Sequence, residues 1–253
     1  MQTIVIIGAS NVTLSLPVIW STLCRSLPEP FRLVVAAGHG RSFGLPNTVL
    51  SRTLPSILEC GLWETLDKLD ELDDSSSIQA IVTDVGNDLL YGVDAAPTMS
   101  WVNETVDRLA HRTQNILITG LPIDSLNGLS ERRFNFFRRV LFPSSTLTLE
   151  SALVEGAELH AQLLKFGDNE FSTTTPEARW YGLDPIHIRR RCRREAWERY
   201  LSLGVPDQPL RRAGPVANLT VWKSKAEQRW KRSRLLTSQQ PALVKNGNEL
   251  WLF

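Results

Sequence analysis

Cysteine is scarce in this chain of 253 residues, and the three that occur are scattered, with no C-x-x-C pair among Cys24, Cys60 and Cys192. So sparse a set argues against a disulfide framework and against a zinc site, and it fits a reducing compartment. An excess of one charge is also missing, because 28 Lys and Arg face 27 Asp and Glu, for a net charge of +1. This balance argues against a general binder of polyanions.

Long apolar runs are absent as well. The N-terminal run over 3–7 is soon interrupted by Gly8 and Asn11, well short of the roughly 18 apolar residues that a membrane span needs. It has no cationic leader and no clear cleavage site of a signal peptide. We therefore expect a strand of the mature protein, no transmembrane segment and a cytoplasmic location.

The chain does contain an alternation of short apolar runs with longer segments of helical periodicity. The predicted strands are 3–7, 32–37, 78–83 and 115–120, and the predicted helices are 12–27, 54–72, 99–113, 132–142, 149–166 and 188–203. We expect the helix at 132–142 to lie over the sheet, and a fifth strand to precede Phe171. This alternation is typical of an α/β protein with a central parallel sheet.

Polar residues follow three of these strands and precede the last predicted helix. The four segments are Gly8-Ala9-Ser10-Asn11, Gly38-His39-Gly40, Gly86-Asn87-Asp88 and Asp184-Pro185-Ile186-His187. Each has an ordinary structural explanation, such as a helix cap for Ser10 or a turn for Asn87. Together they offer a hydroxyl, an imidazole base, a carboxylate and amide donors, which hydrolysis by a serine requires.

In this order the segments resemble the sequence blocks of the SGNH (GDSL-type) hydrolases, over residues 1 to about 203. The resemblance implies a three-layer α/β/α fold of the flavodoxin type, and a serine hydrolase that acts on carboxylic esters through an acyl-enzyme. It implies Ser10 as nucleophile, His187 as general base and Asp184 as the residue that orients His187. It implies no metal and no organic cofactor.

The oxyanion hole that the resemblance implies consists of the Ser10 backbone N–H, a glycine N–H of the second segment and the Asn87 side chain. We favour Gly40 over Gly38 as the glycine donor. Two residues depart from the family pattern, because Ala9 stands where the family has Asp, and Val85 stands where it has Gly. The family Asp supports the nucleophile turn through hydrogen bonds, so Ala9 raises the question of what holds Ser10 in place.

The expected partner is an ester substrate, either a small molecule or an ester of a glycan or lipid, with acyl and alcohol parts left open. An alternative function is a binding or regulatory module that keeps the fold but has lost catalysis. A weaker third alternative is a nucleic-acid-associated protein that binds through its basic C-terminal residues. The oligomeric state stays open.

Residues 204–253 are predicted to form a basic extension that packs on the domain of residues 1–203. Asn246-Gly247 between two apolar runs predicts a β-hairpin there. The cations of the extension and of the helix at 188–203 are interpreted as a solvated face, so no specific nucleic-acid partner is predicted. Arg41 is interpreted in the same way, as a solvated arginine near the site.

Overall fold

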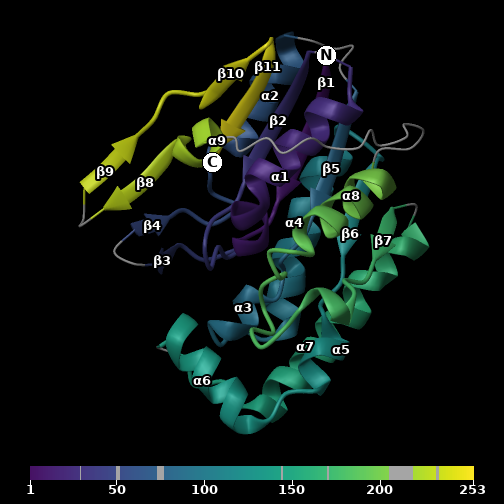
Figure 1. Cartoon of the computed structure of the whole chain (residues 1–253), viewed down its shortest axis with the longest axis vertical. Coiled ribbons are helices and arrows are strands. Elements are labelled where there is room, and N and C mark those ends of the chain that lie inside the picture. Colours follow the sequence, from purple (N-terminus) through teal and green to yellow (C-terminus); the bar gives the residue numbers. More distant parts are fainter. Residues whose placement is uncertain are drawn as a thin grey trace.

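A sheet of seven strands forms the middle layer of the protein (Figure 1). The computed structural model describes residues 1–28, 30–49, 52–72, 77–143, 145–169, 171–204, 219–231 and 234–253. The strand order is β10 (Leu243–Lys245), β11 (Asn248–Leu252), β2 (Phe31–Ala36), β1 (Gln2–Ile7), β5 (Ile78–Val82), β6 (Ile116–Thr119) and β7 (Ser172–Thr174). All neighbours pair in parallel except β10 and β11.

Strand β1 lies at the centre because its side chains are buried on both faces of the sheet. Ile4 and Ile6 belong to one apolar core, and Val5 and Ile7 belong to the other, as the two-residue period of a strand requires. Ile7 pairs with the last residue of β2 and the last residue of β5, Ala36 and Val82. The loops that follow these three strands therefore leave the sheet at the same edge.

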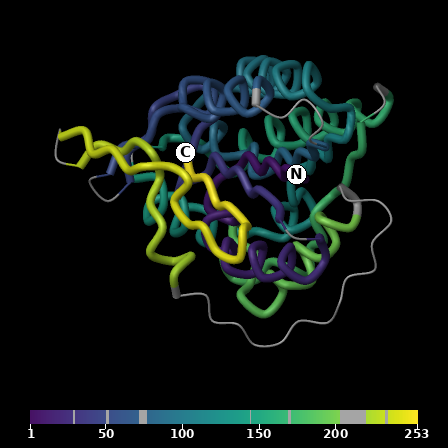
Figure 2. The backbone as a smooth tube through the Cα atoms, turned by 90° about the horizontal axis from the view of Figure 1, so that it is seen from above, coloured from purple at the N-terminus to yellow at the C-terminus, as the bar shows by residue number. Residues whose placement is uncertain are grey.

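Helices cover both faces of the sheet, which confirms the three-layer α/β/α prediction (Figure 2). One core contains side chains of α1 (Ser10–Ser26), α8 (Arg193–Gly204) and α9 (Leu219–Lys223). The other contains side chains of α2 (Leu62–Leu72), α4 (Ala95–Ala110) and α7 (Leu149–Leu164). None of the helices in the described ranges is both long and apolar enough to cross a bilayer.

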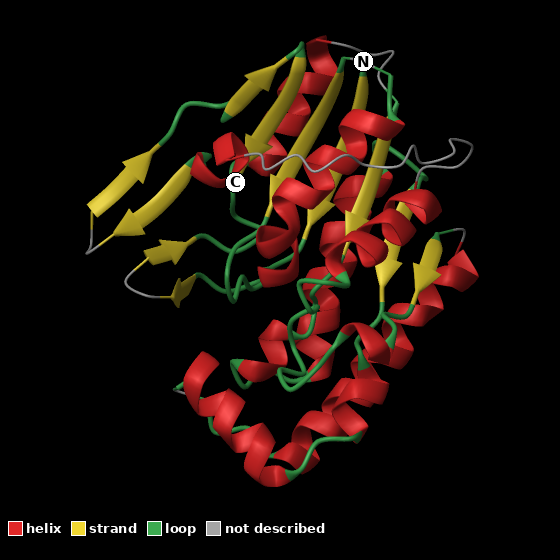
Figure 3. Ribbon diagram, in the orientation of Figure 1, coloured by secondary structure: helices red, strands yellow, loops and turns green. Residues whose placement is uncertain are grey.

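Shorter helices gather beyond the carboxyl edge of the sheet (Figure 3). They are α3 (Asn87–Leu90), α5 (Ile123–Asn127), α6 (Glu131–Leu141) and the 3-10 helix Ala178–Trp180, whereas the 3-10 helix Lys165–Asn169 precedes β7 at the opposite edge. The prediction that the helix near 132–142 lies over the sheet is wrong. Its buried residue Phe134 packs with Ala152 of α7 and Leu129. Because Phe136 and Val140 are exposed, α6 presents no continuous buried apolar face to the sheet.

Three other sequence predictions need correction. The helix predicted over 54–72 begins only at Leu62. Leu54 ends strand β4, Pro55 disfavours a helical backbone for the residue before it, and residues 57–59 form a turn. The helix predicted from residue 188 begins at Arg193, because residues 190–192 form a turn, in which the Cys192 N–H bonds to the carbonyl oxygen of Arg189. The fifth strand is β7, which follows Phe171 and does not precede it.

A second sheet brings the loop after β2 against the C-terminal part of the chain. Its order is β3 (Asn47–Val49), β4 (Arg52–Leu54), β8 (Gln228–Lys231) and β9 (Arg234–Thr237). Between β10 and β11, Asn246 and Gly247 have φ of 53° and 79°, the conformation that favours these residue types in a tight hairpin. Residues 205–218, which begin the extension predicted from sequence, lie outside the described residues.

Candidate active site

Ser10 is the first residue of α1, directly after the turn that leaves β1. The residue at the N-cap position is Ala9, so Ser10 is not the helix cap that its sequence context also allowed. Its side chain is nearly buried, at 4% exposure, and it lines a cavity. Within the described parts of the chain, the Ser10 hydroxyl forms no hydrogen bond, and His187 bonds to Asp184 instead. Such bonds are often long before a substrate binds.

Asp84, which follows β5, holds the turn at Ser10. Its Oδ2 accepts hydrogen bonds from the backbone N–H groups of Ala9, at 3.1 Å, and Asn11, at 2.9 Å. Burial raises the pKa of Asp84, and the hydrogen bonds from Asn11 and Ala9 oppose that rise. The carboxylate therefore gives the turn the support that Ala9 cannot. Sequence reasoning missed this residue, and its φ of +58° is a strained conformation that no sequence pattern reveals.

The second part of the site is the loop that contains Asp184 and His187. Nδ1 of His187 lies 2.6 Å from Oδ2 of Asp184. Oδ1 of Asp184 accepts the backbone N–H groups of Ile186, at 2.9 Å, and His187, at 3.2 Å. Burial would raise the pKa of Asp184, but its bonds with His187 and with the two backbone groups lower it. A carboxylate that stays charged can fix the imidazole tautomer.

Asn11 joins this loop to the turn at Ser10. Its Nδ2 donates to Asp84 Oδ1, at 2.8 Å, and to the carbonyl oxygen of Ile186, at 3.1 Å. Its Oδ1 accepts the backbone N–H of Ile188, at 2.8 Å. The side-chain amide of Asn11 thus bonds the peptide groups on both sides of His187. Asn11 is also the residue directly after Ser10.

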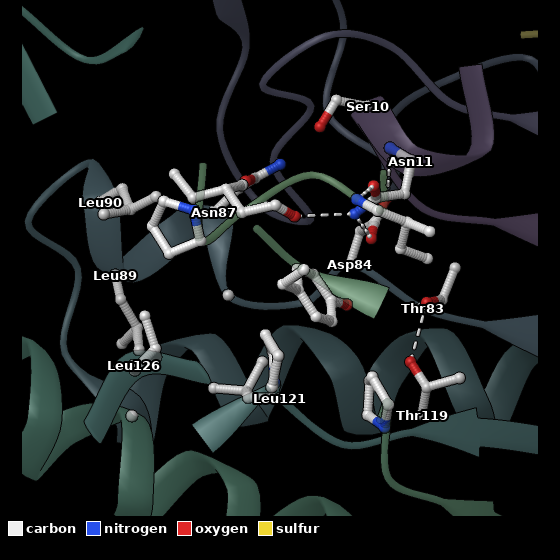
Figure 4. Close-up of a pocket in the computed structure, with 18 of the residues that line it drawn as sticks. Ser10, Asn11, Thr83, Asp84, Asn87, Leu89, Leu90, Thr119, Leu121 and Leu126 are labelled. Carbon is white, nitrogen blue, oxygen red and sulfur yellow. Dashed lines mark hydrogen bonds between the residues drawn. The ribbon is translucent and has the colours of Figure 1, made fainter. Parts of the chain in front are cut away.

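Asn87 lies at the start of α3 and lines the same cavity as Ser10 (Figure 4). Its Nδ2 donates one hydrogen bond to the carbonyl oxygen of Arg41, at 3.2 Å. An amide nitrogen carries two N–H groups, so one remains for another acceptor. Gly40, the favoured glycine donor, has φ of +65°, and its carbonyl oxygen accepts the hydroxyl of Tyr91 at 2.7 Å. Neither Gly40 nor Gly38 lines the cavity.

Arg41 and Asp88 support these loops from within. Arg41 is fully buried, donating to the backbone oxygens of Phe253, at 2.5 Å, and Ser56, at 3.4 Å. The interpretation of Arg41 as a solvated side chain is therefore wrong. Asp88 accepts hydrogen bonds from the Ser42 hydroxyl and the Phe43 backbone N–H. Burial raises its pKa to about 6.

The cavity at Ser10 has a volume of about 110 Å³ and is mostly apolar. Figure 4 shows Ser10, Asn11 and Asp84 near one another, and leucine side chains beyond them. The apolar wall comes from helices α3, α5, α6 and α7 and the loop after β6, through Leu89, Leu90, Leu121, Leu126, Phe134 and Gly156 among others. A pocket of this composition suits a hydrocarbon group. In the described ranges, no cluster of three or more His, Cys, Asp or Glu side chains is arranged to hold a metal ion.

No protein-family model matches this sequence, and no curated protein matches it. Two solved structures are similar to it. One is the psychrotrophic esterase EstA from Pseudoalteromonas sp. in a form inhibited by monoethylphosphonate, with 11% identity, a TM-score of 0.41 and coverage of 79% of this chain and 96% of that one. The other has 13% identity, a TM-score of 0.45 and coverage of 79% and 94%.

Proposed function

We propose that this protein is a serine hydrolase of carboxylic esters, an esterase or deacylase of the SGNH type. The observation that carries the proposal is the 2.6 Å contact between His187 Nδ1 and Asp184 Oδ2, in a loop that Asn11 bonds to the turn at Ser10. With Nδ1 occupied by the carboxylate, Nε2 is left to act as the base. The carboxylate also stabilises the imidazolium that forms when Nε2 takes a proton.

In the proposed reaction, Ser10 Oγ attacks the carbonyl carbon of the ester while His187 accepts the hydroxyl proton. We assign the resulting oxyanion to the Ser10 backbone N–H, the free N–H of Asn87 and the Gly40 N–H. The tetrahedral intermediate then expels the alcohol, which receives the proton from His187. A water molecule, deprotonated by His187, then attacks the acyl carbon of the acyl-enzyme. The bond between that carbon and Ser10 Oγ breaks, Oγ takes the proton back from His187, and the carboxylic acid is released.

The apolar cavity supports an acyl chain as the group that lies beside Ser10. Its lining side chains of Leu89, Leu121 and Leu126 offer no charge to a substrate, so a hydrocarbon chain would gain from leaving water there. No metal or organic cofactor enters the proposed steps.

The test is the substitution Ser10→Ala, assayed with para-nitrophenyl butyrate. We expect kcat to fall at least about 1,000-fold, because no other group in the proposal can form the acyl-enzyme. Ser130→Ala is the matched control, since Ser130 is exposed and stands at the N-cap of α6 without a side-chain cap bond. An active wild type whose Ser10→Ala variant keeps full activity would contradict the mechanism.

The alternative of a binding module without catalysis rests on Ala9. The hydrogen bonds from Ala9 and Asn11 to Asp84 favour the hydrolase, because the turn has a carboxylate partner without the family Asp. A fluorophosphonate probe separates the two functions, since only an activated hydroxyl reacts with it. Labelling at Ser10 supports the hydrolase, and a folded wild type that stays unlabelled supports the binding module.

A further inference from the structure

A second hollow, of about 430 Å³, lies against the paired strands β4 and β8, beside the loop that follows β2. Its lining includes the cationic side chains Arg52, Lys225, Arg229 and Lys231, together with His39. Four cations at one concave site are unexpected in a protein whose net charge is only +1. They come from two parts of the chain about 170 residues apart, which the second sheet brings together.

The register of the second sheet forces two of these charges together. Arg52 of β4 and Lys231 of β8 are directly paired residues across an antiparallel ladder, and like charges in that position destabilise a sheet. Burial lowers the pKa of Arg52, and the positive charge of Arg229 lowers it further. Arg229 therefore adds to the repulsion. This arrangement costs folding free energy that an anion would recover.

The hollow is basic because its cations have no carboxylate partner in the part of the chain that the structure describes. Among the described residues, no Asp or Glu forms an ion pair with Arg52, Lys225 or Lys231. Arg229 donates to the carbonyl oxygen of Ala226, at 3.1 Å, and to the hydroxyl of Ser238, at 2.8 Å. These contacts fix the Arg229 side chain in place, and no carboxylate of a described residue pairs with it.

The hollow borders the candidate active site. His39 lines it and stands between the two glycines considered as oxyanion donors. A terminal guanidinium nitrogen of Arg52 lies 3.7 Å from the position that a Cβ on Gly38 would take. The pKa of His39 is lowered first by burial, then by the charge of Arg52, and then by that of His187. His39 therefore lies within electrostatic range of both the hollow and the catalytic loop. The apolar cavity and the basic hollow are thus separate spaces that both adjoin the catalytic loops.

We propose that the basic hollow binds a small oxyanion, a carboxylate or a phosphate, carried on the alcohol part of the ester substrate. The proposal rests on the proposed function and narrows its substrate class to esters with an apolar acyl chain and an anionic alcohol. Arg52 and Arg229 present planar guanidinium groups, whose geometry matches two oxygens of such a group. A bounded hollow beside one loop suits a single small anion better than a long polyanion, which needs an extended basic track.

The first test compares two aryl butyrates that differ only in the charge of the alcohol. One is the butyrate of meta-hydroxybenzoate, and the other is the butyrate of methyl meta-hydroxybenzoate. To correct for intrinsic reactivity, the enzymatic kcat/KM of each ester is divided by the rate constant of its uncatalysed hydrolysis by hydroxide. At an ionic strength of about 20 mM we expect the wild type to prefer the anionic ester about tenfold in kcat/KM. The preference should shrink at about 500 mM salt, because exposed charges are then screened.

Substitution of the cations tests which residues confer the preference. Arg52→Gln and Lys231→Gln should each lower the anionic-to-neutral ratio at least about threefold, and Lys231 is exposed enough that its loss should not impair folding. Lys165→Gln is the matched control, because Lys165 is an exposed cation that lines neither space. A wild type that hydrolyses both esters equally would overturn the subsite and leave the proposed function intact.

A binding experiment keeps the proposal testable if neither ester is hydrolysed, a result that would count against the proposed function alone. Inorganic phosphate should raise the melting temperature of the wild type above the value in sodium chloride of equal ionic strength, and less so in Arg52→Gln. An equal effect on both proteins, or no effect, would overturn the subsite. So would binding of a short single-stranded RNA under conditions where phosphate has no effect.

Discussion

Asp84 and Asn11 are joined by two hydrogen bonds, one from the Asn11 backbone N–H, at 2.9 Å, and one from its side-chain Nδ2, at 2.8 Å. The carboxylate also accepts the backbone N–H of Ala9 at 3.1 Å. These backbone donors belong to the start of α1, where no intrahelical acceptor is available. A negative charge there is also favoured by the helix dipole. The pair therefore fixes the backbone on both sides of Ser10.

We expect Asp84→Asn to lower kcat about 10- to 100-fold with KM changed less than about threefold. The introduced amide keeps one oxygen for the backbone N–H groups, but it directs an NH2 group at Nδ2 of Asn11. The Asn11 side chain must then turn away and lose its bonds to Ile186 and Ile188, which moves His187 relative to Ser10. Steady-state kinetics with an aryl ester measure the effect.

The control for Asp84→Asn is Asp107→Asn, the same chemical change on the exposed face of α4. A double-mutant cycle with Asn11→Ala tests whether the two residues act as a unit. Because both would act through the same bonds, the double variant should be little worse than the poorer single variant. Fully additive losses would show that Asp84 and Asn11 act independently, and an unchanged kcat in Asp84→Asn would contradict its role at the turn.

The central strands could be predicted from sequence because burial on both faces leaves them almost entirely apolar. Strands β1, β2, β5 and β6 lie within a residue or two of their predicted positions. The parallel register then dictates that the loops after Ile7, Ala36 and Val82 share an edge, so the sequence also predicted that the polar segments meet there.

Contacts between distant segments could not be predicted in the same way. Asp84 reaches the turn at Ser10 from 73 to 75 positions away, and it does so from a positive φ that carries no sequence signal for Asp. The pairing of Arg52 with Lys231 depends on two short strands that lack strong apolar character and are far apart in the sequence, so no hairpin signal connects them. Sequence therefore described the cations of the C-terminal part as a solvated face, whereas several of them line one hollow.

Gly156→Ala should stabilise the protein by about 1 kcal/mol, because Gly is the poorer residue in a helix interior. Gly156 lies inside α7, and an added Cβ would be 3.6 Å from Ile123 Cδ1 and 4.0 Å from Leu126 Cδ1, ordinary contact distances. The methyl group would also narrow the apolar cavity that Gly156 lines. Urea unfolding measures the free energy, and relative rates on acetyl and longer acyl esters measure the narrowing.

Gly8→Ala is the contrasting variant for this prediction. Its Cβ would lie 2.7 Å from Val12 Cγ2 and 2.8 Å from Thr83 Cγ2, so either α1 at Val12 or the segment at Thr83, just after β5, would have to move. We expect the free energy of unfolding to fall. Destabilisation by Gly156→Ala, or tolerance of Gly8→Ala, would contradict the packing described around these two glycines.

Asp88 should make the stability of the protein depend on pH between about 4 and about 6, since burial raises its pKa from 3.8 to about 6. A raised pKa means that the folded state holds the proton more tightly than the unfolded state. The stability it contributes is therefore complete below about pH 4 and is lost as the pH rises through about 6. The loss amounts to about 3 kcal/mol.

The comparison that isolates this effect is the wild type against Asp88→Asn, which cannot titrate at this position. The difference in free energy of unfolding between the two proteins should move in favour of Asp88→Asn from about pH 4 to about pH 6 and stay constant above that range. Loss of a bond from the Ser42 hydroxyl or the Phe43 N–H shifts the difference by a constant and leaves its slope unchanged. A difference that does not vary with pH would mean that Asp88 titrates in the folded protein as it does in the unfolded chain.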